Sequence, residues 1–143
     1  MPQMIFVNLP VQDLTKATAF YESIGFRKDP RFSDETASGM VLTDVIHVML
    51  LTHEKFASFT PRPIADAKAS TEVLLAISAE SREGVDDMVA KATAAGGAAD
   101  PGPQQDYGVM YGRSFEDPDG HIWEVVWMDL AAFLEASGQA QTA

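Results

Sequence analysis

Alternating apolar and polar positions predict the same order of elements in both halves of the chain. Residues 5–9 are an apolar, β-branched run typical of a strand, and Pro10 ends it. Asp13 can then cap a helix, because apolar residues recur at helical spacing from Leu14 to Ile24. Gly25 supplies the left-handed conformation that commonly ends such a helix.

The second half repeats this pattern. Residues 72–78 are typical of a strand, Ser81 can cap the helix that follows, and Gly96 with Gly97 ends it. Corresponding glycines lie about 70 residues apart, and further strand-like segments follow each of them. These segments are residues 26–32, 39–43 and 45–52 in the first half, and 107–115 and 121–128 in the second. The chain is therefore predicted to hold two copies of one βαβββ unit.

One domain is expected to span residues 1–143, because a chain of this length can bury about two thirds of the surface of its unfolded state. The linker between the two units carries Pro61 and Pro63 and is expected to cover the mouth of the fold. The expected parts are a first module at about 4–53, a linker at about 54–70, a second module at about 71–129 and a terminal helix at about 130–136.

The composition disfavours several classes of function. The sequence has no Cys, which rules out disulfides, thiolate metal sites and cysteine nucleophiles. A net charge of −11 with scattered Lys and Arg argues against a nucleic-acid partner. Apolar runs are too short to cross a bilayer, so no membrane partner and a cytoplasmic location are expected. The sequence also lacks a serine nucleophile elbow, a phosphate-binding glycine loop and a dinucleotide fingerprint.

The segment 117–120, Asp-Pro-Asp-Gly, is typical of a tight turn and predicts a hairpin that continues into a strand at 121–127. Alternation places Glu124 between two aliphatic side chains on one face of this strand. A carboxylate in that position needs water, a cation or a hydrogen-bond donor as its partner. His121 falls on the opposite face, where it is expected to buttress the turn.

Two stretches resemble the vicinal oxygen chelate proteins, a group that includes glyoxalases, bleomycin-resistance proteins and extradiol dioxygenases. Residues 6–26 resemble the first module of these proteins, and residues 115–124 resemble their closing hairpin. Residues 106–113 and 123–129 are similar to the branch described as predicted lactoylglutathione lyase. The resemblance implies an α+β fold in which two βαβββ modules form a single curved eight-stranded cup around a small-molecule substrate or ligand. It also implies a homodimer, since members of the group generally pair.

Metal-dependent members of this group hold a divalent cation through one residue from each of four strands. Two of these positions fall on Phe6 and Leu50, which cannot bind a metal, and His47 lies near Leu50 but on the opposite face. The other two positions fall on Glu72 and Glu124. Because such sites usually have at least three protein ligands, a site for nickel, zinc, manganese or iron is incomplete here. Glu72 and Glu124 either share a cation or are hydrated or Arg-paired carboxylates.

Further candidate substrate-binding residues come from the predicted faces of the strands. Asn8 shares a face with Phe6, so it could hydrogen-bond a ligand or, equally, a nearby backbone group. Tyr111 and Arg113 share a face in the second half. If that face lines the cup, Arg113 offers a clamp for an anion; otherwise it pairs with an acidic residue. With Phe6 and Leu50, these residues are the expected lining of the cup.

Three functions follow from the sequence. The first is a glyoxalase-related lyase or isomerase, with Glu124 as general base or metal ligand and Glu72 as its partner. The second is a metal-free protein of the bleomycin-resistance kind that sequesters a drug or metabolite. The observation that suggests it is the presence of Phe6 and Leu50 in place of metal ligands. The third is an extradiol-type dioxygenase, which is disfavoured because its iron needs two His and a carboxylate. Whether Glu72 and Glu124 converge separates the first function from the second.

Overall fold

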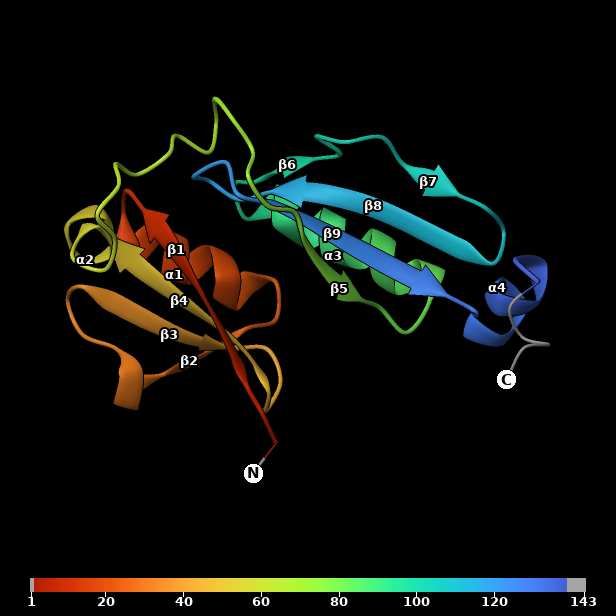
Figure 1. Cartoon of the computed structure of the whole chain (residues 1–143), viewed down its shortest axis with the longest axis horizontal. Coiled ribbons are helices and arrows are strands. Elements are labelled where there is room, and N and C mark those ends of the chain that lie inside the picture. The colour runs from red at the N-terminus through yellow and green to blue at the C-terminus, as the bar shows by residue number, and fades with distance from the viewer. Residues whose placement is uncertain (1, 139–143) are drawn as a thin grey trace.

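Two sheets lie side by side in the computed structural model, which describes residues 2–138 (Figure 1). The first module consists of β1 (Ile5–Val11), α1 (Leu14–Ser23), β2 (Arg27–Asp29), a 3-10 turn η1 (Pro30–Phe32), β3 (Ala37–Val41), β4 (Ile46–Thr52) and α2 (His53–Ala57). The second consists of β5 (Leu75–Ser78), α3 (Arg82–Ala94), β6 (Ala98–Ala99), β7 (Gln105–Asp106), β8 (Met110–Glu116) and β9 (Ile122–Met128), and α4 (Leu130–Ala136) follows it. The predicted repeat of strand, helix and further strands is confirmed.

Both sheets have the same strand order, with one parallel pair each. The first runs β1-β4-β3-β2, with β1 parallel to β4, and the second runs β5-β9-β8-β6, with β5 parallel to β9. β7 also pairs with β8, beside the part of that strand that β6 leaves free. The fold is α+β, as the sequence predicted.

The strand count differs from the expected eight for a local reason. Within residues 2–138, nine strands form two neighbouring sheets of four and five strands. The ninth strand arises because the outer strand of the second sheet is divided into β6 and β7, and Pro101 and Pro103 lie between them. Proline lacks the backbone N–H that a continuous ladder requires. β1 and β5, the edge strands that bound the space between the sheets, form no backbone ladder with each other.

Local hydrogen bonds fix both helix starts where the sequence predicted them. The Asp13 carboxylate accepts from the backbone N–H of Lys16 at 3.0 Å, and the Ser81 hydroxyl accepts from that of Gly84 at 3.0 Å. After the helices, Gly25 adopts a φ of 111° and Gly96 a φ of 103°. These positive values favour glycine, which has no Cβ to clash.

One hydrophobic core joins the two modules through their helices. Phe20 and Tyr21 of α1 are fully buried, and their rings contact Phe115 and Trp123 of the second sheet. Residues of both sheets and of α3 belong to the same buried cluster. The modules are therefore held together by side-chain packing on the helix side of the sheets. No helix within residues 2–138 combines the length and the apolar character that crossing a membrane requires.

Candidate functional site

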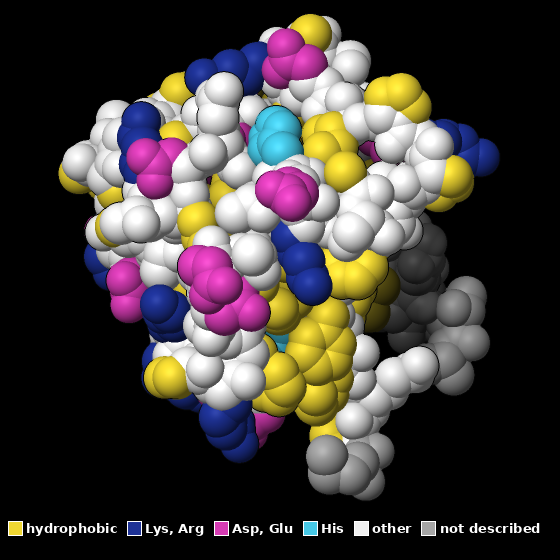
Figure 2. Space-filling model, turned by 90° about the vertical axis from the view of Figure 1, so that its left-hand side faces the viewer, with side chains coloured by type: hydrophobic (Ala, Val, Ile, Leu, Met, Phe, Trp, Pro, Cys, Tyr) yellow, Lys and Arg dark blue, Asp and Glu magenta, His cyan; other side chains and the backbone are white. Residues whose placement is uncertain are grey.

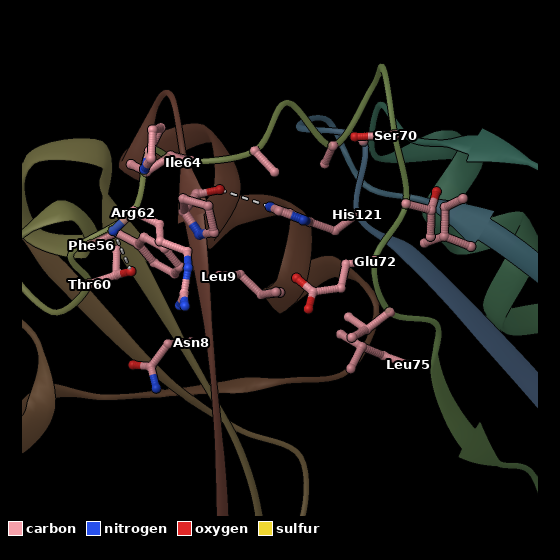
Figure 3. A pocket seen from close by; sticks show the side chains of 18 residues that line it. Asn8, Leu9, Phe56, Thr60, Arg62, Ile64, Ser70, Glu72, Leu75 and His121 are labelled. Atoms are coloured by element: carbon pink, nitrogen blue, oxygen red, sulfur yellow. Dashed lines mark hydrogen bonds between the residues drawn. The ribbon is translucent and has the colours of Figure 1, made fainter.

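A pocket of about 510 Å³ lies between the two modules (Figure 3). Its walls come from β1, α2, the connecting segment between α2 and β5, the start of β5 and the turn before β9. Apolar side chains such as Phe56, Ile64 and Leu75 share these walls with polar ones. Volumes of roughly 300–1,000 Å³ with a few convergent polar groups are typical of small-molecule sites.

Arg62 and Glu72 are the charged pocket residues whose side chains enter the space from different walls. Arg62 belongs to the connecting segment and Glu72 to the stretch that leads into β5 (Figure 3). Both residues are exposed, and neither takes part in an ion pair within residues 2–138. The sequence singled out Glu72 but not Arg62, because nothing in a proline-rich linker shows which way its side chains turn.

Asn8 reaches the same pocket from β1. Its amide Nδ2 donates to the Phe6 carbonyl oxygen at 3.3 Å, and the residue is exposed. The backbone contact, one of the two alternatives raised by the sequence, is therefore present, and Asn8 also lines the pocket. Its side-chain carbonyl remains available as an acceptor for a ligand.

His121 connects the closing hairpin to the first strand at the rim of the pocket. Its Nε2 lies 2.8 Å from the Pro10 carbonyl oxygen (Figure 3). Its backbone N–H donates to the Asp117 carboxylate at 2.9 Å. The expected role in buttressing the turn is confirmed by these bonds. The contact with Pro10 crosses from one module to the other, which the sequence could not show.

A buried hydrogen-bonded chain supports this turn from the core. The Tyr21 hydroxyl donates to Asp117 Oδ2 at 2.6 Å and accepts from Trp123 Nε1 at 3.0 Å. Burial raises the pKa of the Asp117 carboxyl, and burial together with Asp117 raises the pKa of the Tyr21 hydroxyl well above its ordinary value. Tyr21 lies on α1, whereas the other two residues lie in the second module. These hydrogen bonds therefore fix the modules relative to each other.

The connecting segment packs closely on the same turn. Gly120 has a φ of 95°, and a Cβ added there would lie 2.8 Å from the backbone nitrogen of Lys68. A glycine is thus required both by the turn and by the close approach of the segment. The connecting segment, which covers the pocket, therefore packs directly against the hairpin turn.

The residues at the four expected metal positions do not fit a cation within this chain. Glu72 lines the pocket, whereas Glu124 lies within β9 opposite Ala76 and Ser114 and is not part of the pocket wall. Within residues 2–138, no three His, Asp or Glu side chains gather closely enough to hold a metal ion. Phe6 adds no donor atom, so the carboxylates lack the further ligands that such sites need.

The register of β1 and β4 corrects the expected role of Leu50. Leu50 lies opposite Leu9, on the face that α1 covers, and is 0% exposed, so it cannot contact a ligand on the open face. His47 lies opposite Phe6 instead, and the two rings stack with centroids 4.7 Å apart. His47 Nε2 lies 3.0 Å from the Asp44 carbonyl oxygen. Partners in directly opposed positions share a face of the sheet, which places Phe6 and His47 together.

Arg113 and Tyr111 lie on the helix side of the second sheet and not in the pocket. Arg113 forms a two-pronged contact with Asp100, at 3.1 and 2.6 Å, and a third bond with Asp86 at 3.0 Å. Tyr111 donates to Asp86 at 2.6 Å. Hydrogen bonds with Asp100 raise the pKa of the Arg113 guanidinium. Of the two alternatives that the sequence left open for Arg113, acidic pairing is the one observed, and the expected role of Arg113 and Tyr111 in binding a substrate is corrected, because the register with β9 turns both side chains toward α3.

Comparisons with known proteins agree on one family. Residues 3–125 match the model of the Glyoxalase/Bleomycin resistance protein/Dioxygenase superfamily. A search of curated proteins finds no match.

Several solved structures are similar to the chain over most of their length. A hypothetical protein, SA1046 from S. aureus, is 28% identical, with a TM-score of 0.74 over 89% of this chain and 94% of that one. A glyoxalase/bleomycin resistance protein/dioxygenase family enzyme from Burkholderia phytofirmans PsJN is 22% identical, with a TM-score of 0.72 over 89% of this chain and 99% of that one. The fosfomycin resistance protein FosX from Mesorhizobium loti is 15% identical, with a TM-score of 0.66 over 94% and 98%. At these identities the last two show the fold alone.

Proposed function

The chain belongs to the glyoxalase/bleomycin resistance protein/dioxygenase superfamily, and from this premise we propose that it binds a small molecule without a metal ion. The observation that carries the proposal is the pocket of about 510 Å³ beneath the connecting segment, with Asn8, Arg62 and Glu72 on otherwise largely apolar walls. A cavity of this size and lining can surround a small ligand and orient it by a few polar contacts. The proposal is the metal-free alternative that the sequence raised.

The residue at the expected metal-ligand position on β1 supports the metal-free part of the proposal. Phe6 stands where the metal-dependent members have a ligand, and its ring stacks on His47 with centroids 4.7 Å apart. Phe6 offers no donor atom to a cation at this position. Neither Phe6 nor His47 is part of the pocket wall, so the pair bears only on the absence of a metal ligand there.

A ligand screen on chelator-treated protein tests the proposal. We expect molecules from a fragment library to bind equally with and without EDTA, measured by ligand-detected NMR. Thr71→Trp should abolish binding because Thr71 is an exposed residue of the pocket wall. Thr15→Trp, which adds the same side chain to the exposed face of α1, should leave binding unchanged. Binding that is lost with EDTA and returns with nickel, zinc, manganese or iron would refute the metal-free proposal.

A second candidate is a glyoxalase-related lyase or isomerase of the lactoylglutathione lyase type. The observation that favours it is the exposed Glu72 carboxylate in the pocket, where it can remove a proton next to a substrate carbonyl. Glu72 takes the role of base in this proposal, since Glu124 is not part of the pocket wall. Turnover of glutathione hemithioacetals should then fall at least about 100-fold in Glu72→Gln and persist in Glu124→Gln. An extradiol dioxygenase gains no support, because no set of ligands for iron gathers within residues 2–138.

We also propose that the protein forms a homodimer. Ile5 and Phe6 at the start of β1, and Val73 and Leu74 just before β5, are large apolar side chains that remain exposed. Figure 2 shows that apolar side chains form a patch on the side of the molecule that carries the first module. A second copy would cover such surface. Light scattering should give the mass of a dimer for the wild type and of a monomer for Phe6→Asp, and a monomeric wild type would refute the pairing.

A further inference from the structure

We propose that the pocket selects zwitterionic ligands, molecules with a carboxylate at one end, an ammonium group at the other and an apolar body between them. This inference rests on the proposed function, since it names the class of ligand for the same pocket. Arg62 would bind the carboxylate and Glu72 the ammonium group. The two side chains enter the pocket from separate walls (Figure 3).

The backbone around Arg62 is constrained, which limits the directions in which its side chain can leave the main chain. Arg62 lies between Pro61 and Pro63, and a residue that precedes proline is restricted to extended conformations. Its backbone N–H also donates to the Thr60 hydroxyl at 3.2 Å. A guanidinium on such a segment loses less conformational freedom on binding an anion than one on a flexible loop.

Arg62 differs from the cations that stabilise the fold. Arg31, Arg82 and Arg113 each form an ion pair with an Asp, whereas Arg62 forms none within residues 2–138. In a chain with a net charge of −11, an Arg that lines a pocket and forms no ion pair with the pocket carboxylate Glu72 is well placed for an anionic ligand.

Glu72 sets the second requirement. It lines the same pocket, so an anion that binds Arg62 also experiences a carboxylate across the cavity. A ligand with a single negative charge is attracted by Arg62 and repelled by Glu72. A ligand with a single positive charge is attracted by Glu72 and repelled by Arg62. A ligand that carries both charges in the matching order satisfies both side chains. Phe56, Ile64 and Leu75 provide apolar walls for its body.

Calorimetry with three matched probes tests the charge requirement. Para-aminomethylbenzoate carries a carboxylate and an ammonium group on opposite sides of a ring, whereas para-methylbenzoate and para-methylbenzylamine each lack one charge. We expect the zwitterion to bind at least about tenfold more tightly than either control, since one charged hydrogen bond contributes roughly that factor or more. Equal binding of all three probes would overturn the inference.

Substitutions then assign each charge to its residue. Arg62→Met should weaken zwitterion binding about 10- to 100-fold, so that this variant binds the zwitterion and para-methylbenzylamine with equal affinity. In the same way, the Glu72→Gln variant should bind the zwitterion and para-methylbenzoate with equal affinity. Arg27→Met and Glu22→Gln remove the same charges from exposed positions outside the pocket and should change neither. Circular dichroism and thermal unfolding of all four variants check that the fold is retained.

Failure of this inference differs from failure of the proposed function. If a singly charged or neutral molecule binds as well as the zwitterion and Thr71→Trp still abolishes its binding, the pocket binds small molecules but does not select zwitterions. If none of the three probes and no member of the library binds, both proposals are overturned.

Discussion

Tyr21→Phe tests how the two modules are joined, because it removes the hydroxyl oxygen that forms the buried hydrogen bonds with Asp117 and Trp123. Tyr21 is 0% exposed and contacts two partners of the second module through that oxygen. Phenylalanine keeps the ring and its packing. The substitution therefore isolates the hydrogen bonds from the hydrophobic contacts.

The expected cost follows from the two groups that lose their partner. Trp123 Nε1 loses its acceptor, and Asp117 Oδ2 loses its donor while remaining buried. Each unsatisfied buried group costs about 1–3 kcal/mol, so we expect the free energy of unfolding to fall by about 3 kcal/mol. That is a large part of the roughly 5–15 kcal/mol that stabilises a typical domain.

The loss should also depend on pH, with a sign set by Asp117. Burial raises the pKa of this carboxyl in the folded state, and the Tyr21 hydrogen bond opposes that rise. A raised folded pKa means that the stability is greatest at low pH and is lost as the pH rises through the folded value. Removing the hydroxyl raises the folded pKa further. The destabilisation by Tyr21→Phe should therefore be smaller at pH about 5 than at pH about 8.

Urea unfolding followed by circular dichroism at both pH values measures these quantities. Tyr107→Phe is the matched control, because Tyr107 is 66% exposed and its substitution should change stability by less than about 0.5 kcal/mol. If Tyr21→Phe is no more destabilising than Tyr107→Phe, the buried hydrogen bonds of Tyr21 do not hold the modules together. An effect that grows toward low pH would refute the part of the argument that concerns Asp117.

Three further predictions concern ion pairs outside the pocket and the turn beside it. Arg113→Met should lower the free energy of unfolding by about 2 kcal/mol, since the guanidinium is 18% exposed and its loss removes the ion pairs of two carboxylates, Asp100 and Asp86, although Asp86 keeps its hydrogen bond from Tyr111. Urea unfolding checks this, and a loss below about 0.5 kcal/mol would contradict it. The urea midpoint should fall as the pH drops from about 4 to about 2, because the hydrogen bond from Arg31 lowers the pKa of Asp29 to about 2 and Arg113 lowers the pKa of Asp100. A carboxyl whose pKa is lower in the folded state stabilises the fold at any pH above its unfolded pKa, and this stabilisation is lost as the pH falls through the folded pKa. A midpoint that stays constant would contradict this. Gly120→Ala should displace residues 54–70 from the hairpin, because its Cβ would lie 2.8 Å from the nitrogen of Lys68; limited proteolysis should then cleave this segment faster than in the wild type, and unchanged cleavage would show that the contact is dispensable.

The sequence by itself determined the elements that depend on local interactions. Asp13 and Ser81 cap helices through atoms three residues away, and Gly25 and Gly96 end them because only their own backbone must adopt a positive φ. The repeat of strand, helix and strands, the tight turn at 117–120 and the family resemblance were also readable, since each lies in a contiguous pattern.

Only the tertiary structure decided which side chains reach the site. Leu50 was placed on the wrong face and the face of Arg113 was left open, because a one-residue difference in register reverses every side chain of a strand and the register depends on the partner strand. Arg62 entered the pocket because the connecting segment folds back over it. The bond between Tyr21 and Asp117 joins residues 96 positions apart. Such contacts depend on how the two modules pack, and no local pattern of residues encodes that packing.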